Sequence, residues 1–589
     1  QDTNFAQHSI VLQLAKNHQH VCVVGDDAQS IYSFRGADID NILYFTKVYP
    51  DTKVFKLEQN YRSTQTIVRA ANSLIEKNQW QIRKEVFSEK EKGEAIGVYQ
   101  AYSDVEEGDI VVNKIAELRR EKRYAYSDFA ILYRTNAQSR IFEEAMRKRS
   151  MPYRIYGGLS FYQRKEIKDV IAYFRLIVNP NDEEAFKRII NYPARGIGDT
   201  TVGKIIAAAT GHNVSLWTVL CEPLAYGLNF NKGTVGKLQA FRELISAFIT
   251  DAAEKNAYEI GADIIRQSGI INDVCQDNSP ENLSRKENIE ELVNGMSDFC
   301  AQRQEEGNPN VLLGDFLSEV SLLTDQDSDK DGDDEKITLM TVHSAKGLEF
   351  KNVFVVGMEE NLFPSSMVGD SPRALEEERR LFYVAITRAK EYLFIMDSEG
   401  TSEKGIKKLP SRFLQEIGEG NYTRIGKISE ELMREAYGYI KRTAPPPEPK
   451  QGFDIGSDVE HHAFGHGKIV GVDEKRGSLI IKFDKLPQTR NISRSYFEKE
   501  HTVAEVSAPS VAEETKDDNA AVEVKDQIIT PFTPVEGTDT DDKCSSDAEV
   551  ITDIAKTSSD DTPLDSATPP LQDNDGMEEV ERFTIDEKK

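Results

Sequence analysis

The chain has 589 residues and a formal net charge of −27, a length that predicts several domains rather than one. Residues 505–589 hold 24 acidic and 7 basic side chains, a net of −17, so the first 504 residues carry only −10. Because the acidity is concentrated near one end, it does not exclude a local basic site for a nucleic acid. Hydrophobic residues make up 39% of the chain, enough for buried cores.

The cysteines and the apolar runs exclude further classes of protein. The five cysteines lie far apart without paired spacing, which excludes a disulfide scaffold and argues against a zinc site. No apolar run reaches the length of a membrane span, and no signal-peptide pattern is present. We therefore expect a cytoplasmic protein that has no membrane partner.

Short apolar runs alternate with polar helical stretches in the opening 64 residues, and strand patterning resumes at Ile337. Val21–Val24 is a β-branched run that ends in Gly25, which predicts a buried parallel strand followed by a loop. Residues 130–133, 353–356 and 393–396 have the same pattern. Since helical patterns lie between these runs, the predicted class is α/β with a mainly parallel sheet.

Helical periodicity dominates from about Phe161 to Leu323, which predicts a mostly helical domain inserted into the α/β domain. A polar acidic stretch at 325–335 is expected to close it as a solvated loop. Three alternating aspartates and Gly332 in this stretch match the start of a calcium-binding loop, but the closing position is Thr338 rather than Glu. The sequence therefore favours the solvated loop over a calcium site.

The last part of the chain has a different composition. Residues 444–449 read APPPEP and predict a stiff linker. Residues 453–497 alternate polar and apolar side chains with frequent glycines, which predicts a small all-β module. Beyond about residue 504 the chain is acidic, rich in Ser, Thr and Pro, and predicted to be disordered.

The loop after the first predicted strand carries side chains suited to nucleic acid. Residues 23–37 read VVGDDAQSIYSFRGA, and ligands bind at strand ends in open parallel sheets. The loop presents Gln29, the rings of Tyr32 and Phe34, and Arg35. Aromatic rings beside an arginine suit base stacking and phosphate contact; the alternative is a turn that carries core aromatics.

Two strings each present an arginine. LEQNYRST at 57–64 sets Tyr61 and Arg62 before a helix start, where the ring could stack on a purine and the cation could reach a phosphate. EEERRLFYVAITRAK at 376–390 predicts a helix with Arg388 at its end, an arrangement that could supply an arginine finger. The alternatives are a solvated arginine in the first string and a cation favouring a helix C-terminus in the second.

Two further strings could bring backbone amides to phosphates. ITLMTVHSAKGLEFKNVFVVG at 337–357 holds small and hydroxyl residues between two predicted strands. For His343, taken by itself, a structural role is the alternative to a catalytic one. PARGIGDTT at 193–201 places Gly196 and Gly198 in a tight turn before a helix, where amides could hold a DNA phosphate without reading sequence. A plain helix–turn–helix connection is the alternative for this turn.

In order and wording, the four strings of the α/β part resemble superfamily 1 DNA helicases of the UvrD/PcrA/Rep type, over Gln1 to about Ile417, and the later β module resembles the PcrA C-terminal module. The resemblance implies roles at the nucleotide. In that reading Gln29 senses the γ-phosphate, Arg62 and Arg388 contact it, Tyr61 stacks on adenine, Glu349 lies near the ribose, and Gly347 lies in the same nucleotide-facing loop.

The resemblance also implies roles at DNA. Tyr32 and Phe34 would stack on single-stranded DNA beside Arg35, although relatives commonly have Trp where this chain has Phe34, which weakens the expected stacking. Thr341 and His343 would lie nearer the DNA. The turn of Gly196 and Gly198 would contact duplex DNA, because the family's insertion domain uses a similar turn.

The domain organisation implied by the resemblance is RecA-like P-loop NTPase domains, with the first one partial, an inserted helical domain and a small SH3/Tudor-like barrel. The ranges, in chain order, are a remnant of the first RecA-like domain (1–63), the second RecA-like domain in two parts (64–160 and 331–425), the inserted domain (161–330), a linker (426–452), the barrel (453–500) and a disordered acidic tail (501–589).

The implied function is an ATP-dependent 3′–5′ DNA helicase of repair or replication that uses ATP and Mg²⁺. The sequence holds no Gly-rich loop with Lys and Ser/Thr for phosphates, and Gln1–Asn4 resemble the end of the family's motif II without its Asp-Glu pair. We therefore expect the Mg²⁺ ligands to lie upstream, no metal site in this chain, and no activity of the chain alone.

The implied partners are single-stranded DNA and single–double-strand junctions, with RNA polymerase a further candidate for the barrel, and a monomer or weak dimer is expected. A non-catalytic DNA- or RNA polymerase-binding fragment is the alternative function. A RecB/AddA-type recombination helicase is a third reading, which the missing nuclease domain and the chain length disfavour.

Overall fold

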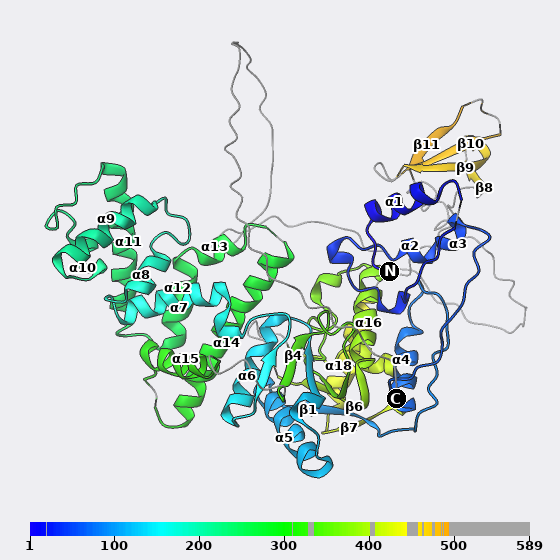
Figure 1. Ribbon diagram of the computed structural model, residues 1–589, viewed down its shortest axis with the longest axis horizontal. Coiled ribbons are helices and arrows are strands. Elements are labelled where there is room, and N and C mark those ends of the chain that lie inside the picture. The colour runs from blue at the N-terminus through cyan, green and yellow to red at the C-terminus, as the bar shows by residue number, and fades with distance from the viewer. Residues whose placement is uncertain are drawn as a thin grey trace, which may run out of the picture. The chain divides into compact units, whose positions relative to one another are not determined.

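The computed structural model describes residues 1–444 except 19, 278, 309, 328–334 and 401–406, and residues 458–493 except 462–463, 474–477, 485 and 487. A seven-stranded sheet, in the order β3-β4-β2-β5-β6-β1-β7, organises the first of these ranges (Figure 1). Every paired strand runs parallel to its neighbour. The strands are β1 (Ile96–Ala101), β2 (Phe129–Tyr133), β3 (Tyr153–Ile155), β4 (Ile337–Thr341), β5 (Phe350–Val355), β6 (Ala389–Ser398) and β7 (Tyr422–Ile425).

The predicted α/β class with a parallel sheet is confirmed, and three of the four predicted strands are observed as β2, β5 and β6. All five residues of β2 are buried. Its side chains alternate between two apolar cores, since Phe129 and Ile131 pack in one and Ala130 and Leu132 in the other. A strand covered on both faces needs apolar residues at every position, which explains the continuous hydrophobic run.

Helices cover both faces of this sheet (Figure 1). The core under one face is shared with α4 (Gln65–Ile75), α16 (Pro372–Ile386) and α17 (Arg412–Ile417). The core under the other is shared with α5 (Asp104–Lys122) and α6 (Ser139–Lys148). Helix α16 begins at a capping residue, Ser371, whose hydroxyl accepts a hydrogen bond from the Ala374 N–H, and Pro372 follows at the first turn, where its missing N–H costs nothing.

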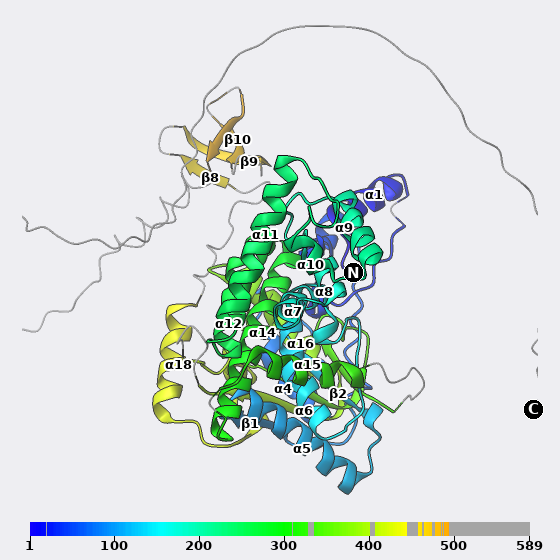
Figure 2. The same ribbon diagram turned by 90° about the vertical axis from the view of Figure 1, so that its left-hand side faces the viewer.

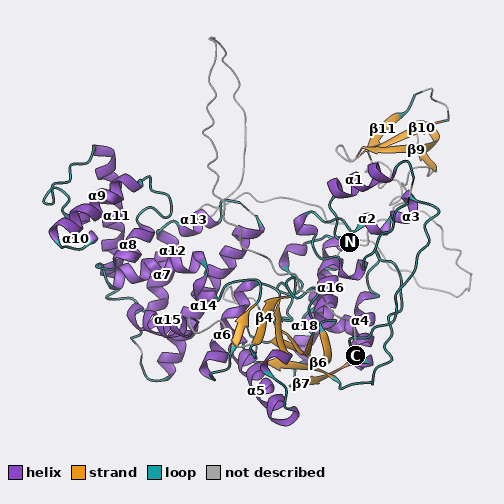
Figure 3. Cartoon of the chain, in the orientation of Figure 1, coloured by secondary structure: helices purple, strands orange, loops and turns teal. Residues whose placement is uncertain are grey.

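Only helices occur among the described residues between β3 and β4, apart from their connecting turns (Figure 3). Their buried side chains form a separate apolar core that includes Phe174, Phe241, Ile264 and Leu292, and α12 lies beside α14 (Figure 2). The helices are α7 (Lys165–Val178), α8 (Glu183–Ile189), α9 (Asp199–His212), α10 (Leu216–Cys221), α11 (Lys232–Asp251), α12 (Ala257–Gln267), α13 (Ile270–Val274), α14 (Pro280–Glu305) and α15 (Leu313–Asp327).

Helix α15 corrects the predicted start of the acidic loop, because residues 325–327 are still helical. Phe316 and Val320 are buried and stabilise the helix, and no Gly or Pro follows Gly314 until Gly332 to end it. The rest of the acidic stretch, 328–334, lies outside the described residues.

Residues 1–63 contain no strand among those described, so the predicted strand at Val21–Val24 is wrong. Val23 and Val24 are 44% and 78% exposed. No described strand pairs with this run, and without a ladder or a covering layer its β-branched side chains have no core to enter. The segment instead holds α1 (Phe5–Ala15), α2 (Asp40–Leu43) and α3 (Phe45–Val48), with two 3₁₀ turns, η1 (Asp27–Gln29) and η2 (Ser33–Arg35).

Helix α18 (Glu430–Arg442) lies in the range predicted as a linker. Leu432 and Ala436 are buried on its inner face, and Glu435 pairs with Lys407 at 2.8 Å. The prolines of the predicted linker and the acidic tail lie outside the described residues. No helix in the described part of the chain is both long and apolar enough to cross a membrane.

Four further strands form an antiparallel sheet in the order β11-β10-β9-β8. They are β8 (Asp458–His461), β9 (Gly465–Asp473), β10 (Ser478–Phe483) and β11 (Arg490–Ser493). Their alternating residues Val459, Ile469, Leu479, Ile481 and Phe483 form one small core, as the period-two pattern of the sequence predicts.

Candidate nucleotide and nucleic-acid site

The loop from β4 to β5 determines how the predicted site residues divide. The two strands are both paired to β2 and run parallel, so their connection must return from the carboxyl end of β4 to the amino end of β5. Thr341 and His343 therefore lie at its start, and Gly347 and Glu349 at its end. The two halves face two different groups of side chains.

The first group gathers the residues predicted to contact the nucleotide. Arg388 Nη2 donates to Gln29 Oε1 at 3.3 Å, across 359 positions of sequence. Arg62 Nε pairs with Glu349 Oε2 at 2.5 Å, and its Nη1 donates to the Thr387 carbonyl at 3.0 Å. Lys390 Nζ reaches the other oxygen of Glu349 at 2.7 Å. Two arginines, an amide and a carboxylate thus lie within one small region.

Arg388 is a buried cation without a carboxylate partner among the described residues, and it is 1% exposed. Its guanidinium donates to the carbonyls of Val384 and Leu348 at 3.0 and 3.1 Å and to Thr387 Oγ1 at 3.0 Å. Burial, and then the neighbouring Arg62, lower the pKa of Arg388 to about 10. A buried charge is normally paired, so this arginine is suited to meet an anion that the described residues do not supply.

Glu349 differs from Arg388 because its charge is stabilised. The hydrogen bonds from Lys390 and then Arg62 lower the pKa of its carboxyl to about 2. The carboxylate is therefore ionised throughout the physiological range and forms ion pairs with both Arg62 and Lys390. Gly347, two residues earlier, has φ +92° and no atom within 4 Å of the position of a Cβ, so its backbone is open to a ligand.

Tyr61 lies beside this group with its ring exposed, at 75%. Its hydroxyl donates to Gln59 Oε1 at 2.7 Å. The turn is shaped by Asn60, whose Oδ1 accepts from the N–H groups of Arg62 and Ser63, both at 2.9 Å. A flat exposed ring next to Arg62 is suited to stack on a base.

The second group gathers the rings predicted to stack on DNA. The Phe34 ring meets His343 edge-on at 5.2 Å between centroids, and Tyr32 lies 6.0 Å from Phe34. The Tyr32 hydroxyl donates to the His343 carbonyl at 3.2 Å. Arg35 is exposed and lies 5.4 Å from the centre of the Phe34 ring. The rings are thus grouped, with Phe34 49% exposed.

His343 is held neutral in this group. Burial, and then the charges of Arg134 and Arg35, lower the pKa of its imidazole to about 3. Thr341 makes no ring contact; its Oγ1 lies 3.0 Å from Ser344 Oγ and accepts from the Ser344 N–H at 3.3 Å, so it shapes the loop.

Gly196 and Gly198 are not brought near either group by any described contact. Gly196 has φ +68°, and its carbonyl accepts from Lys237 Nζ at 3.0 Å. Gly198 caps α9, and nothing lies within 4 Å of its Cβ position. The side-chain oxygen of Asn191 accepts from the N–H groups of Arg195 and Ile197, both at 3.0 Å, and fixes the turn.

Two family models match the chain, the UvrD-like helicase C-terminal domain over residues 55–400 and the UvrD/REP helicase N-terminal domain over residues 1–50. The chain belongs to the UvrD-like helicase family. The ATP-dependent DNA helicase PcrA of Staphylococcus aureus is 40% identical over 496 residues, which cover 82% of this chain and 66% of the relative. PcrA of Staphylococcus epidermidis is 40% identical over 508 residues with the same coverage. The chain thus spans slightly less than two thirds of the length of these relatives.

A solved structure titled as the C-terminal domain of a possible DNA helicase from Lactobacillus plantarum is also similar, at 12% identity and a TM-score of 0.24. It covers 62% of this chain and 98% of that chain. The sequence identity and the TM-score are too low for this structure to inform the fold.

Sequence reasoning on this UvrD-like chain missed Lys346, which links the two groups. Its Nζ pairs with the carboxylate of Asp2, donates to the Gln29 carbonyl at 2.8 Å and lies 4.7 Å from the centre of the Tyr32 ring. The sequence did hold a signal for this residue, since Lys346 lies inside the string at 337–357 and directly precedes Gly347.

A second lysine, Lys84, was also missed. It pairs with Asp26 and, at 2.8 Å, with Asp27, and Asp26 in turn accepts from Gln29 Nε2 at 2.6 Å. No pattern in its own segment pointed to this contact, since Lys84 lies among other charged residues in a loop.

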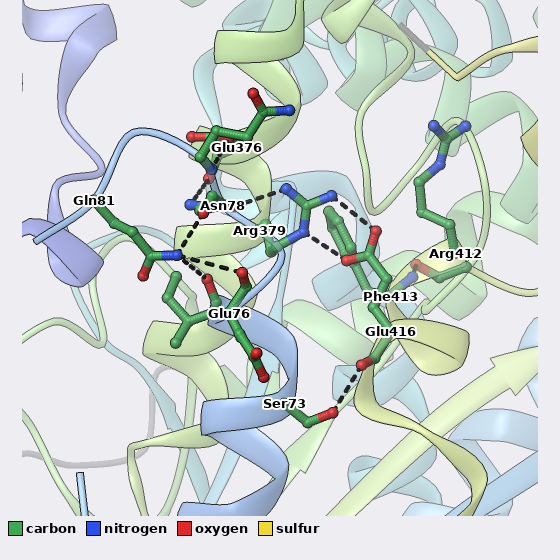
Figure 4. A network of polar contacts seen from close by, with 12 residues as sticks. Ser73, Glu76, Asn78, Gln81, Glu376, Arg379, Arg412, Phe413 and Glu416 are labelled. Carbon is green, nitrogen blue, oxygen red and sulfur yellow. Dashed lines mark hydrogen bonds and ion pairs between the residues drawn. The ribbon is translucent and has the colours of Figure 1, made fainter. Parts of the chain in front are cut away.

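Helix α16 of this helicase family member is anchored by a polar network that the sequence did not predict (Figure 4). Arg379 donates from Nε and Nη2 to the two oxygens of Glu416 at 2.6 and 2.8 Å, and from Nη1 to Asn78 Oδ1 at 2.7 Å. Asn78 Nδ2 donates to the backbone carbonyl of Glu376 at 3.2 Å. Helices α16 and α17 and the segment that follows α4 are therefore tied together.

Proposed function

We propose that this chain forms the part of an ATP-dependent DNA helicase that contacts the γ-phosphate of ATP and grips single-stranded DNA. The observation that carries the proposal is Arg388, a buried cation without a carboxylate partner among the described residues, beside Arg62 and Gln29. Such a constellation suits an anion with several oxygens, because arginine forks bind phosphates. The name of the PcrA relatives supports ATP as that ligand.

The roles follow from the geometry of each side chain. Arg388 and Arg62 would stabilise charge on the terminal phosphate, and Gln29 would orient toward it because its amide already contacts Arg388. Tyr61 would stack on the adenine. Glu349 would release Arg62 and accept hydrogen bonds from the ribose, and the open backbone at Gly347 would let the nucleotide approach.

The residues present fit the terminal phosphate but not the whole nucleotide. No string in the sequence would cradle the β-phosphate, and no group of three or more metal-binding side chains occurs in the described part of the chain. We therefore propose that Mg²⁺ and the remaining phosphates depend on residues outside this sequence, and we expect no ATP hydrolysis by the chain alone.

The domain organisation that we propose has a second RecA-like domain split at 64–160 and 331–425, with the helical segment 161–330 inserted and residues 1–63 belonging to the first RecA-like domain. The separate core of α7–α15 supports the insertion. Strands β8–β11 would complete a Tudor-like barrel that contacts RNA polymerase. The turn of Gly196 and Gly198 would contact duplex DNA at junctions. The protein would act in the cytoplasm as a monomer or weak dimer and move 3′ to 5′ along DNA.

On the DNA side, Tyr32 and Phe34 would stack on bases while Arg35 contacts a phosphate. Thr341 and His343 would complete this surface from the β4–β5 loop. Stacking on an aromatic contributes roughly 1–3 kcal/mol per base, so two rings and one exposed cation are enough for a modest affinity.

The experiment measures binding of the 589-residue chain to fluorescent oligo(dT) at several salt concentrations. We expect the double variant Tyr32→Ala with Phe34→Ala to bind at least about tenfold more weakly with an unchanged salt slope, because stacking is not ionic. Arg35→Ala is the contrasting variant, and it should reduce the slope. Unchanged affinity of the double variant would exclude the stacking role.

A second measurement tests the nucleotide side by adding MgATP to the same chain. Wild type should bind it weakly, and Arg388→Met should abolish that binding while leaving oligo(dT) affinity within about twofold. The missing phosphate loop favours one other function, a non-catalytic DNA- or RNA polymerase-binding fragment. If the chain binds DNA and Arg388→Met leaves its MgATP binding unchanged, that alternative is favoured.

A further inference from the structure

The 3₁₀ turn η2 presents the proposed stacking ring but has no cap of its own. It spans Ser33–Arg35, and its N-terminal flanking residue, Tyr32, makes no side-chain capping bond. Gly36 ends the turn at φ +82°, a conformation that glycine adopts without strain. Phe34 and Arg35 are both exposed on this short turn, so their directions depend on what holds its first N–H.

Glu377 supplies the missing cap from α16, 344 positions away. Its Oε1 accepts from the Ser33 N–H at 3.0 Å, and its Oε2 accepts from the Ser33 hydroxyl. Both bonds have an ionised acceptor, which makes them about twice as strong as bonds between neutral groups. The carboxylate thus does for η2 what an N-cap side chain does for a longer helix.

The remaining contacts make α16 a rigid support for this turn. Arg380 Nε donates to the Ser30 carbonyl at 2.8 Å, and Arg373 Nη1 pairs with Asp40 at 2.9 Å. Arg388, two residues past the end of the helix, contacts Gln29. At a rise of 1.5 Å per residue, Glu377 and Arg388 are separated by roughly 16 Å along one helix direction. The helix that ends at the proposed phosphate arginine therefore also holds the turn that carries the stacking ring.

We propose that Glu377 is a positioning residue for single-stranded DNA, which fixes the direction of Phe34 and Arg35 by capping η2 and thereby couples their direction to α16. The inference rests on the proposed stacking role of Phe34. Glu377 itself does not touch DNA, and its negative charge would by itself repel a phosphate backbone.

That sign makes the test sharp. The oligo(dT) affinity of the 589-residue chain is measured for Glu377→Gln, with Glu431→Gln, an exposed glutamate of α18, as the matched loss of one charge. If charge alone mattered, both variants would bind slightly more tightly than wild type. We expect Glu377→Gln to bind about five- to tenfold more weakly and Glu431→Gln to equal wild type within about twofold.

A double-mutant cycle separates positioning from a general structural effect. In a background that carries both Phe34→Ala and Arg35→Ala, Glu377→Gln should weaken binding by less than about twofold, because both side chains that it positions are gone. Additive effects would overturn the inference. Ser33→Ala, which removes only the hydroxyl bond on an exposed turn, should weaken binding about two- to threefold and keeps the test valid if Glu377→Gln folds poorly.

Limited trypsin digestion tests the cap without DNA. Cleavage after Arg35 should be several-fold faster in Glu377→Gln than in wild type, since an uncapped turn opens more often. Equal cleavage rates would refute the capping role. Wild type that fails to bind oligo(dT) would overturn the proposed function, whereas wild-type binding with an unaffected Glu377→Gln variant would overturn this inference alone.

Discussion

Two buried arginines on or beside α16 should respond very differently to the same substitution. Arg379 is 6% exposed and Arg388 is 1% exposed. Arg379 is paired in a fork with Glu416, whereas in the described part of the chain Arg388 donates only to neutral groups and lies near another arginine. We predict that Arg379→Met is strongly destabilising and that Arg388→Met is nearly neutral. Methionine keeps most of the side-chain volume, so neither change opens a large cavity.

The magnitudes follow from the surroundings of each guanidinium. Burial, and then Arg62, lower the pKa of Arg388 to about 10, well below the ordinary value of an arginine, which at 1.36 kcal/mol per pKa unit is roughly 3 kcal/mol against the charged form. Its hydrogen bonds return about 1 kcal/mol each, and Val384 keeps a second donor in Thr387 Oγ1. The net change in unfolding free energy for Arg388→Met should be about 1 kcal/mol or less. Removing Arg379 leaves Glu416 without its partner, which costs about 3–5 kcal/mol.

Urea unfolding followed by Trp80 fluorescence measures this contrast. The chain has two tryptophans, so a Trp217→Phe background leaves only Trp80, which lies against Arg373 in the α/β part. Trp217 packs in the helical core and would otherwise report that core. A loss for Arg388→Met as large as that for Arg379→Met would refute the view that Arg388 is held for an external anion.

Two further predictions concern single residues. The pKa of His343, about 3 in the folded chain against an ordinary 6.5, means that the unfolded chain binds the proton first. The stability contributed by the neutral ring is therefore lost as the pH falls from 6.5 toward 3, by about 2 kcal/mol at pH 5. In urea unfolding at pH 7 and pH 5, His343→Gln should show a smaller difference in unfolding free energy than wild type. An unchanged difference would contradict this role of His343. Gly196→Ala should cost about 1 kcal/mol, because φ is +68° and a Cβ would lie 2.6 Å from Lys237 Nζ, while Gly198→Ala, in open space, should be tolerated. Thermal unfolding followed by Trp217 fluorescence measures both, and equal effects would contradict the assignment of strain to Gly196 alone.

The class of the fold could be predicted from sequence because burial leaves a local pattern. The run at residues 130–133 is apolar at every position because β2 is covered on both faces. The helical periods between residues 161 and 323 reflect side chains that face one separate core. The same reasoning failed at Val21–Val24, because a β-branched run indicates only a local preference for strand conformation. Whether a partner strand exists is decided elsewhere in the chain.

The site could be predicted only as separate strings. Its residue types were visible, since Gln29, Arg62 and Arg388 each lie in a distinctive stretch, and the resemblance between four strings and one family gave them an order. The sequence by itself could not tell whether Arg388 merely favours a helix C-terminus or is a buried cation.

Only the tertiary structure decided which of these side chains meet. Arg388 contacts Gln29 across 359 positions, and Glu377 caps a turn 344 positions away. Such contacts leave no periodic signal in the sequence, because they depend on how the apolar cores on the two faces of the sheet bring distant segments together. Local sequence therefore determined the elements and the chemistry available at their ends. The long-range packing of those elements determined which charges are paired and which, like that of Arg388, have no carboxylate partner among the described residues.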